Sequence, residues 1–220
     1  GISYFSIIPV KLKKFEADHQ FYRGVLVSLP IVGLLLSAFT ILLFLILPFP
    51  LLYKAILCSI LYLFLYGFLH LEAVCDTIDG YFASLSKKDV YDVMHEPQVG
   101  SIGAIGGFCF VLLKILAIAY LLYYECYISI MLAMIFSRVS LFFALDLEYH
   151  EKSHFIKSIQ NAFSTPLFIK LLFLPCSLLT KFILHTLKNK LGFLNGDMLG
   201  FNIELQEILY LNLAIILILF

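Results

Sequence analysis

Three carboxylates, Glu72, Asp76 and Asp79, follow a long apolar run at positions i, i+4 and i+7. On a helix these positions fall within about 60° of arc, so the three side chains share one face. Clustered like charges are costly, above all in a membrane, unless a cation neutralises them. Mg²⁺ suits such a cluster, because it takes carboxylates and completes its shell with waters and phosphate oxygens. The pattern therefore predicts a Mg²⁺ site for a phosphate-bearing substrate, with Glu72, Asp76 and Asp79 as ligands.

The same segment has the form D-x-x-D-G and ends at Gly80. A glycine leaves no side chain at a point where a substrate would approach, so we expect Gly80 to lie beside the substrate. A solvated helix end with ordinary acidic residues is the alternative. It is disfavoured because Glu72 shares the face and a second acidic cluster follows later in the chain.

That second cluster opens with Asn195 and Asp197 and continues with Glu204 and Glu207 at helical spacing. The dipole of a helix accounts for an acid at its first turn, as at Asp197. It does not account for Glu204 and Glu207, which lie two and three turns into an otherwise uncharged segment. Ionisable residues at such depth are functional by default. We therefore expect Asp197, Glu204 and Glu207 to be catalytic and Asn195 to contact the substrate.

Two basic residues, Lys114 and Arg138, lie within apolar segments. A cation there must pair with an acid or extend to the membrane interface. We expect pairing with the acids of the site, with Arg138 in catalysis and Lys114 in substrate binding. His70 falls on the opposite face from Glu72, which indicates a packed, hydrogen-bonded histidine beside the substrate site.

Gly100 and Gly103 stand at the start of another apolar segment. They could expose backbone N–H groups to an anion at a helix N-terminus. They could equally be small packing positions between spans. The histidine pair His150 and His154 has i, i+4 spacing, but no third ligand accompanies it, so zinc is not indicated.

Composition places the chain in a membrane. It is 62% hydrophobic and only 14% charged, where soluble domains contain about 25% charged residues. It carries no basic stripe or aromatic-basic motif of the kind that binds nucleic acid. The five cysteines form no CxxC pair and are interpreted as small buried hydrophobes. We expect an all-α, polytopic integral membrane helical bundle in one catalytic domain, residues 1–220, which could form a homo-oligomer.

The predicted bundle has six to seven spans. Pro166 and Pro175 interrupt the apolar region 162–187, which favours a re-entrant hairpin there over a single crossing. No basic segment followed by a cleavage site precedes the first span, so no signal peptide is expected. The remaining predicted spans are 24–48, 55–74, 105–124, 126–145 and 203–220.

Lysines set the predicted orientation. Those of residues 11–14, the pair Lys87 and Lys88, and the pair Lys152 and Lys157 fall on one side of the membrane if the spans alternate. Basic loops stay in the cytoplasm, so the acidic motif at 72–80 is expected to face the cytoplasm.

Three motifs, in this order, resemble the cobalamin synthase family. They are His70-Leu-Glu-x₃-Asp-Thr-x-Asp-Gly80, Met94-x-x-Pro-x-Val-Gly100-x-x-Gly103 and Gly196-Asp-x-x-Gly200-x₃-Glu204-x-x-Glu207. The resemblance spans nearly the whole chain. It implies a multi-pass enzyme of the bacterial cytoplasmic membrane that joins adenosylcobinamide-GDP to α-ribazole, or its 5′-phosphate, and releases GMP.

The resemblance also implies roles for residues. Asp76 and Asp79, with Glu72, would bind Mg²⁺, and an acid among Asp197, Glu204 and Glu207 would orient or deprotonate the attacking hydroxyl. Arg138 or Lys114 would offset the negative charge.

Six residues, at four places in the chain, depart from the family pattern. The family usually has Asp-Gly at Glu72-Ala73, Lys-Asp at His95-Glu96, often Arg at Gln98, and Thr at Asn195. These departures put the role of residue 72, and any phosphate contact from residues 95 and 98, in doubt.

Two alternatives remain. A CDP-alcohol phosphotransferase-like lipid enzyme would carry a D-G-x-x-A-R motif, which is absent from this sequence. A cation- or proton-coupled transporter often shows an internal repeat. The D-x-x-D-G form occurs once in the sequence, at residues 76–80, so no repeat of it is seen.

Overall fold

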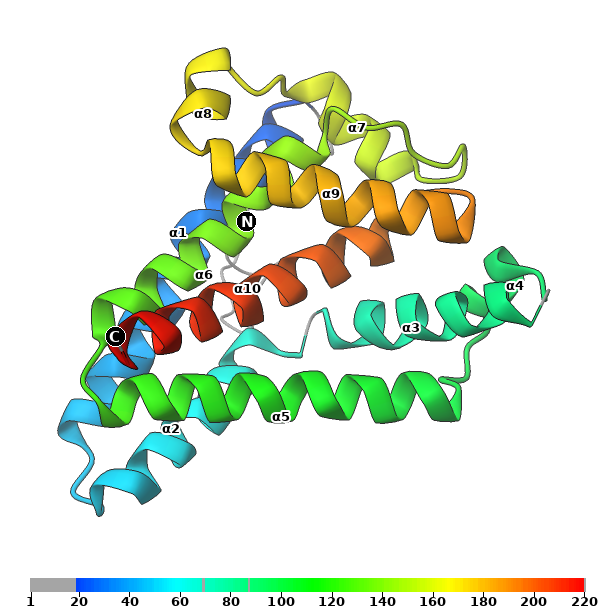
Figure 1. Ribbon diagram of the computed structural model, residues 1–220. Coiled ribbons are helices and arrows are strands. Elements are labelled where there is room, and N and C mark those ends of the chain that lie inside the picture. Colours follow the sequence, from blue (N-terminus) through cyan, green and yellow to red (C-terminus); the bar gives the residue numbers. More distant parts are fainter. Residues whose placement is uncertain (1–18, 69, 87, 220) are drawn as a thin grey trace.

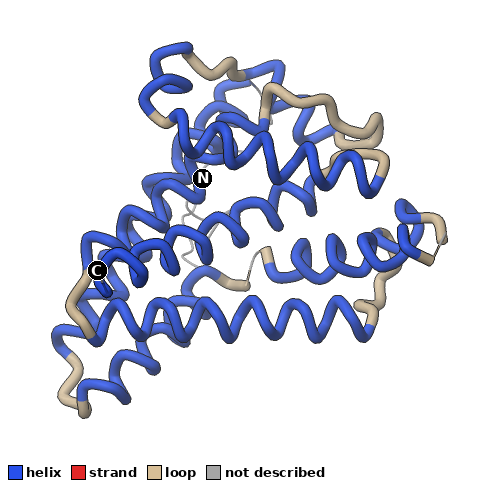
Figure 2. The backbone as a smooth tube through the Cα atoms, viewed as in Figure 1, coloured by secondary structure: helices blue, strands red, loops and turns tan. Residues whose placement is uncertain are grey.

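The computed structural model describes residues 19–68, 70–86 and 88–219. These residues form ten helices, α1 to α10, joined by loops and turns, with no strand among them (Figures 1 and 2). The all-α prediction is therefore confirmed for the described chain. The lysines at 11–14 lie outside these residues.

Four of the described helices are long and apolar enough to cross a membrane. A fifth span is reached only if the bent pair α2 and α3 counts as one. The predicted count of six to seven spans is not confirmed. The four helices are α1 (His19–Ile46), α5 (Ser101–Tyr123), α6 (Tyr127–Ala144) and α10 (Gly196–Leu219).

Close packing of α1 against α6 depends on one small residue. A Cβ atom on Gly33 would lie 2.7 Å from the carbonyl oxygen of Met134, so no larger residue fits there without displacing a backbone. The hydroxyl of Ser37, one turn later, donates to the Gly33 carbonyl at 2.9 Å. This satisfies a buried polar group inside the helix that carries it, as membrane helices require.

The span predicted at 55–74 is not one continuous helix. Helix α2 (Leu51–Tyr66) ends where Gly67 takes a left-handed conformation, with φ of 72°, and α3 (Leu71–Leu85) starts after it at an angle of 85°. A glycine that adopts positive φ without strain is a common helix C-terminus. The acidic motif therefore lies on a separate helix of 15 residues, which α4 (Val90–Met94) follows.

Region 162–187 also differs from the predicted hairpin. Both prolines begin helices: Pro166 precedes α8 (Leu167–Leu172), and Pro175 occupies the first turn of α9 (Leu174–Leu191). Proline suits a helix start because its missing N–H has no partner there in any case. Neither α8 nor α9 qualifies as a span. Helix α9 instead packs against α6 and α10, and the short α7 (His154–Ala162) packs against α1.

Helix α3 carries the predicted metal ligands and packs against both α5 and α10. Figure 1 shows α3 and α5 side by side, with the first turns of α5 and α10 at the same end of the molecule as α4. The carboxylates of α3 thus lie at the end of the molecule where α3, α4 and the first turns of α5 and α10 come together.

Candidate active site

Asp79 caps helix α5. Its two carboxylate oxygens accept the backbone N–H groups of Gly100 and Gly103, each at 2.8 Å. A Cβ on Gly100 would lie 2.6 Å from Asp79 Oδ1, and a Cβ on Gly103 would lie 2.6 Å from the carbonyl oxygen of Cys75. The packing interpretation of these glycines is therefore observed, whereas their predicted contact with a substrate anion stays a prediction, because Asp79 takes both N–H groups. They allow close packing, and their N–H groups bind an anion, which is the side chain of Asp79.

Gly103→Ala is expected to lower the free energy of unfolding by about 1–3 kcal/mol, the usual cost of overpacking. The added methyl group would collide with the Asp79 carboxylate and with the backbone of α3. Thermal unfolding in detergent measures the change. Gly24→Ala is the matched control, because a Cβ there meets nothing within 4 Å. Equal melting temperatures for the two variants would contradict this packing.

Gly80 does not face open space. A Cβ on this residue would lie 2.7 Å from Cγ of Met94, so Gly80 allows α4 to fold back onto α3. The predicted place of Gly80 beside the substrate is corrected accordingly. Its small size serves the packing of two helices.

Asp76 on α3 lies near enough to Asp197 on α10 for the two carboxylates to interact electrostatically, where the helices pack. The crossing is close because a Cβ on Gly200 would lie 2.7 Å from Cβ of Ala73. Burial, followed by the negative charges of Asp197, Glu72 and Asp79, raises the pKa of Asp76 to about 6. Within the described residues, neither Asp76 nor Asp197 forms an ion pair. The crossing therefore brings together carboxylates that have no ion-pair partner in the described part of the chain.

Asn195 fixes the position of Asp197. Its Nδ2 donates to Asp197 Oδ2 at 2.8 Å, while its Oδ1 accepts the N–H of Met198 at 3.2 Å, at the first turn of α10. Asn195 is buried and Asp197 is half-buried. The predicted substrate contact of Asn195 thus becomes an indirect one, through the carboxylate that it holds.

The three predicted metal ligands lie in different surroundings. Asp79 is engaged by α5, Asp76 faces α10, and Glu72 is exposed. Among the residues that the structure describes, no three His, Cys, Asp or Glu side chains lie close enough together to hold a metal ion. The negative charge that acts most strongly on Asp76 is that of Asp197, from another helix.

Glu204 and Glu207 belong to a second, buried cluster with both intramembrane cations. Lys114 pairs with Glu204, and its Nζ lies 2.9 Å from Glu207 Oε1, while Arg138 pairs with Glu207. All four side chains are at most 8% exposed. The predicted pairing of Lys114 and Arg138 with these acids is observed, and the two positive charges balance the two negative ones.

Two tyrosines of α2 complete this cluster. Arg138 Nη2 donates to the hydroxyl of Tyr62 at 2.8 Å, and the hydroxyl of Tyr66 donates to Glu204 Oε1 at 2.7 Å. The Tyr66 hydroxyl also contacts His70 Nδ1, which lies 3.7 Å from Glu204 Oε1. The interpretation of His70 as a packed, hydrogen-bonded histidine agrees with this. Our sequence reasoning missed both tyrosines, although their i, i+4 spacing places them on one face.

The two predicted acidic clusters are therefore divided differently in space. Asp197 lies near Asp76 at the start of α10. Glu204 and Glu207, further along α10, connect this helix to α2, α5 and α6 through Lys114, Arg138 and the two tyrosines. The latter four charged groups have partners on several sides and little access to solvent. This arrangement favours a positioning role for them over direct contact with substrate.

Asp197 also lines a cavity of about 280 Å³, whose other lining residues include basic and aromatic side chains. Tyr91 stacks on His95 with ring centroids 4.0 Å apart, and Lys152 lies over the Tyr91 ring at 4.6 Å. His95 is close enough to Asp76 for its charged form to favour the ionised carboxylate. Sequence reasoning did not place Tyr91 or Lys152 at the site, because they are separated along the chain.

Comparison with known proteins places this geometry in a family. Residues 1–215 match the family described as cobalamin-5-phosphate synthase. Proteins named adenosylcobinamide-GDP ribazoletransferase are similar over nearly the whole chain. One from Treponema denticola is 27% identical over 96% of this chain and 94% of its own length. Others, from Alkaliphilus oremlandii and Clostridium botulinum strain Okra, are 28% and 29% identical, each over 98% of this chain and 95% and 96% of their own lengths. No solved structure matches the chain. The chain belongs to the cobalamin-5-phosphate synthase family.

Proposed function

We propose that this chain is an adenosylcobinamide-GDP ribazoletransferase, as its relatives are named. It joins adenosylcobinamide-GDP to α-ribazole or α-ribazole 5′-phosphate and releases GMP. The observation that supports this most is the pair of half-buried carboxylates, Asp76 and Asp197, which interact electrostatically and have no ion-pair partner among the described residues, in a member of this family. Membership of the family does not favour a lipid phosphotransferase or a transporter.

The reaction transfers a substituted phosphoryl group. A ribose hydroxyl of the acceptor forms a bond to the phosphorus nearest the cobinamide, the bond from that phosphorus to the oxygen of GMP breaks, and the hydroxyl proton is released. Such transfers need in-line positioning and neutralisation of charge more than covalent help from the protein. A cation held by the carboxylates, together with the neighbouring basic cavity, would meet these needs.

Mg²⁺ fits the carboxylates of α3. Asp76 and Glu72 stand one turn apart, carry the oxygen ligands that Mg²⁺ prefers, and lack an ion-pair partner in the described chain. The ion commonly takes only one or two protein carboxylates and fills its shell with waters and phosphate oxygens. We propose Asp76 and Glu72 as its holders. When bound, Mg²⁺ would neutralise charge on the diphosphate.

Asp197 is the residue proposed to act on the acceptor. Asn195 holds its Oδ2, which leaves Oδ1 to accept the hydrogen bond of the ribose hydroxyl and then its proton. Asp79 acts indirectly, because its bonds to Gly100 and Gly103 hold α3 against α5. Glu204, Glu207, Lys114 and Arg138 position α10, and with it Asp197.

The site is proposed to open to the cytoplasm of a bacterium, at the inner membrane. If the bent pair α2 and α3 makes one return crossing, then α5 and α10 both start on the side where α1 starts. Lys88, Lys152 and Lys157 lie in or next to segments at that side, where basic residues mark the cytoplasm. Asp76 and Asp197 lie near the same end.

Removing Mg²⁺ is expected to abolish the reaction. Purified protein in detergent, given adenosylcobinamide-GDP, α-ribazole 5′-phosphate and MgCl₂, should release GMP, and excess EDTA should stop the release because the diphosphate charge is no longer neutralised. Chromatography of the nucleotide measures GMP. Restoring MgCl₂ should restore the rate, which excludes damage by the chelator. Undiminished release in EDTA would contradict the proposed metal, and absent release under all conditions would contradict the proposed function.

A further inference from the structure

Two cavities meet at Asp197. The first, which we call the apolar cavity, has a volume of about 230 Å³ and lies between α1, α3, α6, α7 and α10. The second, which we call the basic cavity, has a volume of about 280 Å³ and lies among α4, the loop before α7 and the start of α10. They share four lining residues: Phe155, Ile156, Gly196 and Asp197. The two cavities therefore adjoin one another at the Asp197 carboxylate.

The apolar cavity suits an uncharged ring. Its wall is mostly leucine, isoleucine and valine, including Leu26, Leu199 and Ile203, all less than 8% exposed. The polar side chains in its lining are His70 and Asp197. Pockets of this kind bind apolar groups, and the few polar groups at their edge fix the orientation.

The basic cavity suits a phosphate. Lys152 contributes a permanent positive charge and is held over Tyr91. His150 Nδ1 accepts the N–H of Lys152 at 3.4 Å, so the neutral ring carries its proton on Nε2 and presents a donor there. Among the residues that line this cavity, Asp197 is the one carboxylate. An anion in this cavity would lie beside basic side chains that can donate hydrogen bonds, namely Lys152, His95, His150 and His154.

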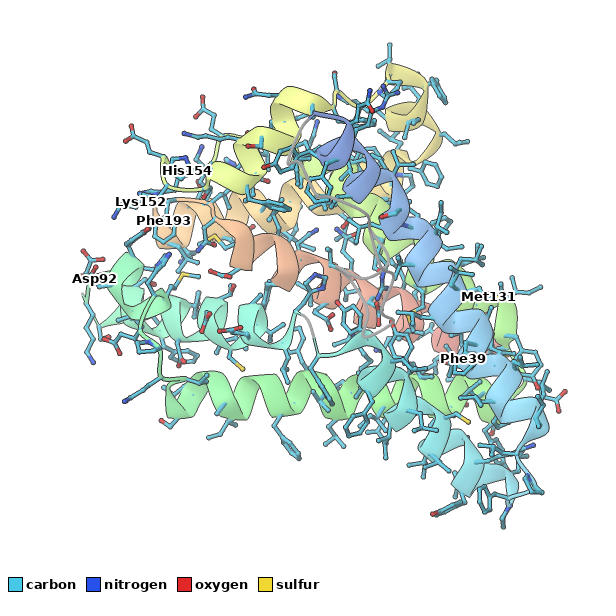
Figure 3. All side chains as sticks on the ribbon, turned by 180° about the vertical axis from the view of Figure 1, so that it is seen from behind. Phe39, Asp92, Met131, Lys152, His154 and Phe193 are labelled. Atoms are coloured by element: carbon cyan, nitrogen blue, oxygen red, sulfur yellow. The ribbon has the colours of Figure 1, made fainter. Side chains whose placement is uncertain are left out.

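The loop that carries these donors is anchored to the active site. The backbone N–H of His150 donates to the carbonyl of Leu194 at 2.8 Å, directly before Asn195 and Asp197. The His150 ring also contacts Phe193 at 5.5 Å between centroids. Figure 3 shows Lys152, His154 and Phe193 gathered at one end of the molecule, close to Asp92 of α4. The basic side chains are thus held at a set place relative to Asp197.

On the basis of the proposed function, we propose that the acceptor binds across both cavities. Its apolar benzimidazole ring occupies the apolar cavity, its ribose lies at Asp197, and its 5′-phosphate lies in the basic cavity beside Lys152 and His150. The order ring, ribose and phosphate along the ligand matches the order of the two cavities about Asp197. Lys152 and His150 therefore select the phosphorylated acceptor over free α-ribazole.

Lys152→Gln tests the phosphate contact. We measure kcat/KM for α-ribazole 5′-phosphate and for α-ribazole with saturating adenosylcobinamide-GDP and MgCl₂. The wild-type ratio of the two should exceed one, and Lys152→Gln should lower it by about tenfold or more, the effect of losing one charge-assisted hydrogen bond. Lys157→Gln is the matched control, because the Lys157 Nζ donates to the Glu151 carbonyl at 3.4 Å and does not line the cavity. An unchanged ratio in Lys152→Gln would overturn the proposal.

Ile203→Phe tests the apolar cavity. A larger side chain there should raise KM for both acceptors by the same factor, since both carry the benzimidazole ring, and should spare KM for the donor. Direct titration of α-ribazole 5′-phosphate into wild type and Lys152→Gln, without donor, gives a readout independent of turnover. A raised KM for the donor instead would assign this cavity to the corrinoid and overturn the acceptor's place. Turnover of both acceptors with an unchanged ratio in Lys152→Gln defeats the inference alone, whereas no turnover of either acceptor defeats the proposed function.

Discussion

Asp76→Asn should lower kcat for GMP release by about 10²–10³-fold, the range seen when one charge-stabilising group is removed from an active site. Asparagine keeps the size of the side chain and removes its charge, and with it the carboxylate proposed to hold Mg²⁺. Burial and like charges already disfavour ionisation of Asp76. The substitution should therefore not destabilise the fold, and the melting temperature should stay equal to that of wild type or rise.

Asp146→Asn is the matched control for Asp76→Asn. Asp146 forms an ion pair with Lys170 at 2.6 Å, with both side chains about one-third exposed or less. Pairs of this kind contribute little, so the control should keep the wild-type rate. Initial rates at saturating substrates, with melting temperatures measured in the same detergent, separate catalysis from folding. A rate for Asp76→Asn within a few-fold of wild type would remove this residue from the active site.

Arg138→Met should lower the free energy of unfolding by about 3–5 kcal/mol, because it leaves Glu207 buried with one cation fewer. Arg138 pairs with Glu207 and also donates to the Met134 carbonyl at 3.0 Å and the Tyr62 hydroxyl at 2.8 Å. Thermal unfolding and the yield of monodisperse protein in detergent measure the loss. Lys170→Met removes an exposed ion pair in the same way and should cost less than about 1 kcal/mol.

The double variant Arg138→Met with Glu207→Gln should recover most of this stability. It removes one positive and one negative charge and leaves Lys114 paired with Glu204. Replacing both members of a buried pair is far less costly than removing one. If the double variant is as unstable as the sum of the single ones, the charge balance of this cluster is not what holds the four helices together.

Sequence patterns predicted the helical bundle because apolar runs of this length have few other solutions. They also predicted that Lys114 and Arg138 pair with acids, since an unpaired cation is costly in a membrane. They did not predict which acids sit together. Asp197 and Glu204 share a helix face but stand about 10 Å apart along its axis at 1.5 Å per residue. The position of each acid along the helix axis, and the neighbouring helices that pack there, decide which side chains it contacts.

Three features differ from the sequence predictions for identifiable reasons. Gly67 ends α2 inside a continuous apolar run, and hydrophobicity carries no signal of that break. Asp79 was assigned to metal because its spacing matches Asp76, yet the N–H groups that bind it come from residues 21 and 24 positions later. The basic cavity joins Tyr91 to Lys152 across 61 positions of sequence. Contacts of this kind exist only once the helices have packed.

The fate of one phosphorus atom tests the central claim, that Asp76 and Asp197 serve a phosphoryl transfer to a ribose hydroxyl. Adenosylcobinamide-GDP labelled with ³²P at the phosphorus nearest the cobinamide is incubated with the protein, MgCl₂ and α-ribazole 5′-phosphate, and the products are separated. We expect all transferred label to stay with the corrinoid product, GMP to be unlabelled, and Asp76→Asn to transfer little label. Label in GDP or in inorganic phosphate, or equal transfer by Asp76→Asn, would contradict the claim.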